Sequence, residues 1–324
     1  MRVLGIESSA HTFGVGIVEE GKVIANEKMM FKVTNKGMIP GKVAETHITN
    51  AAKVVALALK AAKLKIGDIE GVGYTRGPGL GPCLQVGEMT AKTIANKLGV
   101  KIAQVNHGAA HAEISRDAAK MRDPLILYVS GGNSQILKLA KTPFRHYAIL
   151  GETFDIGVGN MMDTFAREVG LNPAWGSTVA KIGEGGEYTK LPYTVKGMDF
   201  AFTGLLTHAI KKAQTEKIED LCYSIQETAF SMLCEATERA IFLTDSKELC
   251  VCGGVAQSRR LREMLFGIAK THKIKFGYAA DAFNADNGAM IAFVAERMLR
   301  NGIHSRIEEC GIEQRYRIDR AVIV

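Results

Sequence analysis

Two histidines four residues apart, His107 and His111 in the segment NHGAAHAEI, have the spacing of a metal-binding pair. We expect this segment to be helical, and in a helix this spacing stacks both imidazoles on one face, where they can chelate a single ion. Two unrelated, partly buried histidines are the alternative interpretation. A zinc peptidase needs a glutamate directly after the first histidine, as general base. Gly108 occupies that position, so the sequence disfavours peptidase chemistry.

A metal held by two imidazoles also needs an anionic oxygen ligand, and Asp286 in ADNGAMIAFVAERM is the best candidate. It stands at the expected start of a helix, where an N-cap role is the competing interpretation. Tyr128, at the end of a predicted strand, offers a further oxygen, although strand tyrosines more often serve in packing. The sequence therefore predicts a mixed nitrogen and oxygen site assembled from distant segments.

Three turns rich in glycine or serine follow predicted strands: ESSAHTFG (7–14), VSGGNSQ (129–135) and CGGVAQS (252–258). Such turns expose backbone N–H groups to phosphates and allow close approach of a ligand. None matches a Walker A or dinucleotide fingerprint, and each alone is compatible with an ordinary tight turn. Together they favour a nucleotide, and Asp163 in GNMMDTFAREVG is a candidate ribose acceptor, with an exposed helical aspartate as the alternative.

The elements around these residues repeat. Strands are expected at 3–7, 14–19 and 22–30, a helix near 40–63, a strand at 71–75, a helix at 84–98 and a strand at 101–106. A second series begins with strands at 125–129, 135–140 and 147–151 and continues with helices near 159–169, 204–212 and 221–242, a strand at 249–252 and a helix at 286–300. With 324 residues, this repetition predicts an α/β protein of two related lobes with mixed sheets.

Composition excludes several classes of protein. Hydrophobic residues make up 47% and charged residues 23%, the balance of an ordinary globular protein. The longest apolar window, 51–62, contains Lys53 and Lys60 and is too short to span a bilayer. Six cysteines form no CxxC pair, which favours reduced core thiols over a zinc-thiolate site. A formal charge of +7 favours an anionic partner such as RNA.

Motifs along nearly the whole chain resemble those of the tRNA N6-adenosine threonylcarbamoyltransferases, the catalytic subunits of the KEOPS complex, formerly named O-sialoglycoprotein endopeptidases. The resemblance is closest to the archaeal type. The segments that carry it, in chain order, are GIESSAHTFGVGIV, RGPGLGPCL, VNHGAAHAEI, YVSGGNSQIL, GETFDIGVGNMMDTFAREVG, KGMDFAFTGLL, QETAF, GGVAQSRRLREML and ADNGAMIA.

The resemblance implies duplicated ribonuclease-H-like lobes of the actin/Hsp70/sugar-kinase (ASKHA) type. The expected division is an N-terminal lobe at 1–115, with 301–324 packing back on it, and a C-terminal lobe at 116–300. The implied reaction transfers the threonylcarbamoyl group from threonylcarbamoyl-AMP to N6 of adenosine 37, in tRNAs that read codons starting with A. It takes place in the cytoplasm, with the metal ion in the cleft between the lobes.

The resemblance also implies ligands and partners. The cofactors would be one iron or zinc ion and an ATP- or AMP-type nucleotide. The partners would be tRNA, a small dimerising subunit, a small atypical protein kinase and the regulator of that kinase. The implied metal ligands are His107, His111, Tyr128 and Asp286; the implied nucleotide or substrate contacts are Tyr128, Val129, Ser130, Gly131, Gly132, Asp163, Gly176, Gly253, Gly254 and Ser258.

The chain departs from the family pattern around the expected nucleotide. Trp175 replaces a glycine, Ala180 replaces a glutamate near the ribose, and Ser258 and Gln85 replace other motif residues. These departures bear on nucleotide affinity and rate, and leave the metal ligands intact. Two other functional classes stay open at this point: a metallohydrolase or peptidase, and a nucleotide-gated scaffold of the actin/Hsp70 type that performs no group transfer.

Overall fold

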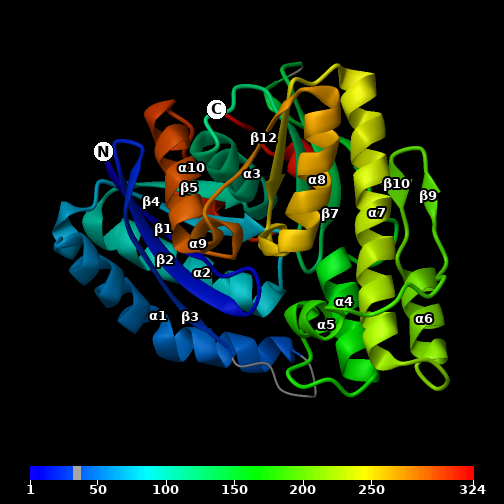
Figure 1. Cartoon of the computed structure of the whole chain (residues 1–324). Helices are drawn as coiled ribbons and strands as arrows, with labels where there is room; N and C mark the ends of the chain where they lie inside the picture. The colour runs from blue at the N-terminus through cyan, green and yellow to red at the C-terminus, as the bar shows by residue number, and fades with distance from the viewer. Residues whose placement is uncertain (32–37, 143) are drawn as a thin grey trace. The chain divides into compact units, whose positions relative to one another are not determined.

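The computed structural model describes residues 1–31, 38–142 and 144–324, which form two compact units (Figure 1). Unit 1 comprises Met1–Ile114, Ala140–Tyr147 and Ala280–Val324, and unit 2 comprises Ser115–Leu139 and Ala148–Ala279. Residues 280–300, expected in the C-terminal lobe, thus belong to unit 1. The reason is that helix α10 (Gly288–Arg300) packs against the first sheet.

Unit 1 is built on a five-stranded mixed sheet with the order β3-β2-β1-β4-β5. Its strands are β1 (Arg2–Glu7), β2 (Thr12–Glu19), β3 (Lys22–Met30), β4 (Gly71–Gly77) and β5 (Lys101–Asn106). The first three strands are antiparallel neighbours, whereas β1, β4 and β5 run parallel. The predicted order of elements in this half is confirmed.

Helices cover both faces of this sheet. Helices α1 (Pro40–Ala62) and α2 (Gly81–Leu98) pack on one face, where Leu4 and Ile6 join their buried side chains. Val3 points to the opposite face, where it packs with residues of α10. This alternation follows from the two-residue period of a strand. Helix α3 (His107–Ala118) follows β5 directly, and the short α9 (Asp281–Asn284) precedes α10.

Unit 2 repeats the same sheet topology. Its five-stranded sheet has the order β12-β11-β6-β7-β8. Strand β6 is antiparallel to β7 and parallel to β11, which in turn is parallel to β12. The strands are β6 (Leu125–Val129), β7 (Ser134–Ala140), β8 (His146–Glu152), β11 (Glu248–Cys252) and β12 (Lys275–Tyr278). The predicted internal repeat is therefore confirmed at the level of strand pairing.

The helices of unit 2 surround a large apolar core centred on the buried helix α7 (Ile218–Thr244). The others are α4 (Val158–Glu168), α5 (Gly176–Ile182), α6 (Thr203–Lys212) and α8 (Arg259–His272). The small hairpin of β9 (Val195–Lys196) and β10 (Asp199–Phe200) completes the unit. Helices α5 and α8, strand β12 and this hairpin were not predicted.

Helix α6 depends on a side chain from a distant loop for its N-terminal cap. Its N-cap residue is Phe202, which has no capping group. The Asp155 carboxylate instead accepts from the backbone N–H groups of Phe202 at 3.0 Å and Thr203 at 2.8 Å. Burial raises the pKa of Asp155, but these hydrogen bonds outweigh it and hold the pKa below its ordinary value.

Replacing Asp155 with alanine is expected to lower the free energy of unfolding of unit 2 by about 1 kcal/mol, the typical cost of losing a helix cap. Because the native pKa is depressed, this contribution is present above the ordinary aspartate pKa and is lost as pH falls through the native one. Fluorescence of Trp175, the single tryptophan of the chain and part of unit 2, reports the transition. Asp155→Asn, which keeps one acceptor, should lose less. Equal stability of all three proteins would contradict the capping role.

Two composition-based predictions can be compared with the structure. All six cysteines are free and buried, and burial raises the pKa of the Cys250 thiol to about 12, which keeps it protonated. Within the described parts of the chain, no helix combines the length and apolar character needed to cross a membrane.

Candidate metal centre

The histidine pair is positioned by the junction between β5 and α3. Strand β5 ends at Asn106, and the Asn106 side-chain oxygen accepts from the backbone N–H of Ala109 at 3.0 Å, as an N-cap does. His107 and His111 therefore occupy the first turns of α3, and both rings are buried. Their ring centroids are 4.8 Å apart. The predicted helix and its shared histidine face are confirmed.

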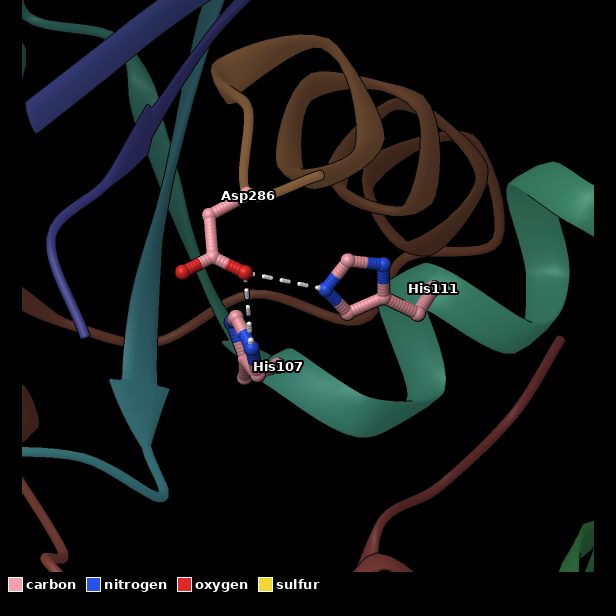
Figure 2. Close-up of side chains that lie close together, drawn as sticks. All are labelled: His107, His111 and Asp286. Carbon is pink, nitrogen blue, oxygen red and sulfur yellow. Dashed lines mark hydrogen bonds and ion pairs between the residues drawn. The ribbon is translucent and has the colours of Figure 1, made fainter. Parts of the chain in front are cut away.

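Asp286 approaches this pair from the segment before α10. The N-cap of α10 is Asn287, whose side chain accepts from the backbone N–H of Met290 at 3.0 Å. The interpretation of Asp286 as the helix cap is therefore wrong, and its carboxylate is available for another role. Figure 2 shows it pointing at both imidazoles: Asp286 Oδ1 lies 3.3 Å from His111 Nε2 and 3.6 Å from His107 Nε2.

Two of the three spacings in this cluster, those from Asp286 to each imidazole, match the spacing around one small cation. One ligand atom from each of the three residues can be chosen such that all lie within 4.8 Å of one another. Ligands about 2.0–2.2 Å from a tetrahedral zinc ion are about 3.3–3.6 Å apart. Two imidazole nitrogens with one carboxylate are also the donor set of non-haem iron sites. All three residues belong to unit 1.

Burial and mutual contacts set the charge of each residue in the cluster. Burial raises the pKa of Asp286, but the hydrogen bond to His111 and the neighbouring His107 outweigh it and hold the pKa well below its ordinary value. Burial lowers the pKa of His111 more than Asp286 raises it, so this imidazole is neutral. Burial also lowers the pKa of His107, but the Glu7 carboxylate reverses the shift and raises it to about 9. The cluster thus joins the anionic Asp286 oxygen to the neutral His111 imidazole, whereas His107 is protonated near neutral pH without an ion and must lose its Nε2 hydrogen when an ion binds.

Glu7 is the residue of this region that sequence reasoning missed. It ends β1 and is fully buried, and its Oε2 lies 2.9 Å from His107 Nδ1. Burial raises the pKa of Glu7, but His107 outweighs this and the pKa is lowered overall. The only available signal was an ionisable residue at the end of an otherwise apolar strand.

The residues expected to contact a nucleotide all lie in unit 2. Tyr128 and Val129 are the last residues of β6, Ser130–Gly132 form the turn after it, and Gly253 follows the neighbouring parallel strand β11. A Cβ on Gly253, whose φ is 94°, would lie 2.3 Å from the Val129 carbonyl oxygen. The two turns therefore meet at the carboxyl ends of adjacent parallel strands, where α/β sheets commonly bind ligands.

The remaining expected contacts lie on helices and turns of the same unit. Asp163 on α4 accepts from the backbone N–H of Gly176, the first residue of α5, at 2.7 Å. Gly254 opens a 3₁₀ turn, and Ser258 caps α8 by accepting from the backbone N–H of Leu261. This hydrogen bond connects Asp163 with Gly176 directly. The ligand roles of these residues, and that of Tyr128 toward a metal, stay predictions.

Known proteins match this chain over nearly its whole length. A family model described as tRNA N6-adenosine threonylcarbamoyltransferase matches residues 21–293. A protein of that name from Sulfurisphaera tokodaii is 44% identical over 328 residues, covering 98% of this chain and 97% of the relative. Another from Thermococcus sibiricus is 45% identical over 322 residues, covering 98% of each.

Solved structures of more distant proteins share the fold. HypF of T. kodakarensis aligns with a TM-score of 0.61 at 14% identity, over 93% of this chain and 48% of that one. The activator of 2-hydroxyisocaproyl-CoA dehydratase from Clostridium difficile, with bound ADPNP, gives 0.53 at 15% identity, over 94% and 99%. With the repeated sheet topology, these likenesses establish the duplicated α/β architecture of the ASKHA type. By the family match and these relatives, the chain belongs to the tRNA N6-adenosine threonylcarbamoyltransferase family.

Proposed function

We propose that this protein transfers the threonylcarbamoyl group of threonylcarbamoyl-AMP to N6 of adenosine 37, in tRNAs that read codons starting with A. The observation that carries the proposal is the kinship of about 44% identity over nearly the full length with enzymes named for this transfer. The buried cluster of His107, His111 and Asp286 adds a site suited to the chemistry. The exocyclic amine of adenine is a poor nucleophile, so positioning and stabilisation of the departing AMP must provide most of the acceleration.

The metal centre proposed here is held by His107, His111 and Asp286, with Tyr128 as a further ligand and iron or zinc as the ion. When bound, the ion would supply Lewis-acid stabilisation of carbamoyl or phosphate oxygens. The protein contributes the arrangement: α3 fixes both imidazoles, and Asn287 caps α10 so that the adjacent Asp286 carboxylate is free to face them. A peptidase is not supported, because Gly108 stands where the general base would be needed.

The nucleotide part of the substrate is proposed to bind to the turns after β6 and β11, with Asp163 and Gly176 beside it. Support comes from the meeting of these two turns at the ends of parallel strands. Backbone N–H groups in such turns stabilise phosphate oxygens through fixed dipoles. Trp175 is the N-cap residue of α5, immediately before Gly176, and its bulk is expected to modulate affinity for the ribose.

Partners are proposed on the same basis. tRNA is the macromolecular substrate, and a formal charge of +7 favours its approach. From the family resemblance we further propose that the protein acts in the KEOPS assembly. Its partners there are a small dimerising subunit, a small atypical kinase and the regulator of that kinase. The proposed location is the cytoplasm, where tRNA is available as substrate.

The proposal is tested by incubating the full chain with unmodified tRNA and threonylcarbamoyl-AMP, with and without the three partner subunits. Digestion of the tRNA followed by mass spectrometry should detect threonylcarbamoyladenosine only when this chain is present. A tRNA with guanosine at position 37 is the matched substrate control. Adenylate turnover without modified tRNA, in the presence of all partners, would contradict the transferase and favour a nucleotide-gated scaffold.

A further inference from the structure

In each of its described hydrogen bonds, the Glu7 carboxylate is the acceptor. Its Oε1 accepts from the backbone N–H of Ser9 at 2.6 Å. Its Oε2 accepts from Thr75 Oγ1 at 2.7 Å and faces His107 Nδ1 at 2.9 Å. Because the side chain is fully buried, three donors hold it as an acceptor in place of water. His107 Nδ1 must therefore carry a hydrogen that it donates to Glu7.

This contact decides which nitrogen of His107 faces Asp286. With Nδ1–H committed to Glu7, the other ring nitrogen, Nε2, is the one that lies 3.6 Å from Asp286 Oδ1. We propose that Glu7 is a positioning residue of the metal centre: it fixes the tautomer and ring orientation of His107 so that Nε2 presents its lone pair to the ion. Carboxylates behind ligating histidines act in this way and increase ligand basicity. The inference rests on the metal centre proposed above.

A role limited to packing is the competing explanation. Glu7 connects β1, β4 and α3 through Thr75 and His107, so its loss will also cost stability. The two explanations differ in their expected effects on metal affinity and on the His107 tautomer. A packing role predicts lower stability with unchanged metal affinity in the folded protein, whereas a positioning role predicts weaker metal binding and a changed tautomer of His107.

Glu7→Gln separates the explanations because it keeps the shape and replaces one acceptor oxygen with an NH₂ donor. If that NH₂ group faces Ser9, two N–H donors oppose each other and the hydrogen bond from the Ser9 backbone is lost. If it faces Thr75 and His107, the Thr75 hydroxyl can turn to the Ile6 carbonyl oxygen, 3.3 Å away, and His107 Nδ1 must become an acceptor. The hydrogen then moves to Nε2, where it blocks the ion. We expect Zn²⁺ affinity to fall roughly 10- to 100-fold, the usual effect of an outer-shell partner.

The measurement is Zn²⁺ affinity of the metal-free full chain, by competition with a chromophoric chelator. Glu88→Gln is the matched control, because Glu88 is another buried carboxylate of unit 1, on α2, and pairs with Lys92 at 2.7 Å. His111→Ala establishes whether the zinc observed is at the cluster. Wild-type affinity in Glu7→Gln would overturn the positioning role alone. Unchanged affinity in His111→Ala would overturn the proposed metal centre and this inference with it.

A second measurement does not require the Glu7→Gln variant to fold. Nitrogen NMR of the zinc-loaded wild-type chain, labelled at histidine, should show His107 with a hydrogen on Nδ1 and the metal on Nε2. Absence of the signal in His107→Ala assigns it. Ligation through Nδ1, or loss of the Nδ1 hydrogen, would overturn the inference even if Glu7→Gln does not fold.

Discussion

Replacing His111 with alanine is expected to reduce metal affinity by more than about 100-fold and to abolish threonylcarbamoyl transfer. Loss of an outer-shell partner alone typically costs 10- to 100-fold, and His111 is a proposed ligand that is fully buried beside Asp286. The remaining imidazole and carboxylate would hold an ion only weakly. Metal content by elemental analysis and transfer by nucleoside mass spectrometry should fall together.

The control for this prediction is another buried histidine of the same unit. His47 is 1% exposed and its Nε2 lies 2.9 Å from the Ala10 carbonyl oxygen, outside the cluster. His47→Ala should lower stability while metal content persists. Full transfer by His111→Ala protein that contains no metal would contradict the proposed role of the ion in the reaction.

The sequence predicted the parts of this centre that have a local signature. The four-residue spacing of His107 and His111 can be recognised directly in a segment expected to be helical. The acidic residue before the last helix, Asp286, was predicted as the third ligand. Glu7 could not be found in this way, because its partner His107 is 100 residues away. A carboxylate at the end of an apolar strand has no periodicity that announces a contact formed only by the tertiary fold.

The same limit applies to the elements. Strands and helices with clear apolar patterns were predicted to within a few residues, including the repeat of the two halves. Helix α8 was missed because a glycine turn at 252–258 was interpreted alone, without the capped helix that Ser258 begins. The assignment of α10 to unit 1 was also missed, since its packing partners β1 and β2 lie at the opposite end of the chain.

The packing of α10 explains how a segment near residue 286 is brought to the histidines, and it depends on small residues. Gly5 on β1 and Gly16 on β2 are direct cross-strand partners in the sheet. A Cβ on Gly5 would lie 2.1 Å from the Ala292 backbone nitrogen, and one on Gly16 would lie 2.2 Å from that of Ala289. The two glycines thus form a groove into which the backbone of α10 fits, a close approach that no other residue type permits.

Gly16→Ala is therefore expected to lower the free energy of unfolding of unit 1 by about 3 kcal/mol or more, toward the upper range for overpacking, since the added methyl group meets rigid backbone. To relieve the overlap α10 must withdraw, and Asp286, which directly precedes its cap, must move with it. Metal affinity should fall although Gly16 contacts none of the three proposed ligands. Hydrogen exchange of β2 and α10 peptides and chelator competition measure the two effects.

Gly41→Ala provides the comparison, because a Cβ at that position in α1 meets no atom of the described residues within 4 Å. Alanine is a better helix former than glycine, so this variant should be as stable as the wild type or slightly more so. If Gly16→Ala behaved like Gly41→Ala, the sheet would tolerate withdrawal of α10, and close packing could not be what sets the position of Asp286. If it lost stability but retained full metal affinity, the carboxylate would be held by the histidines themselves rather than by the helix behind it.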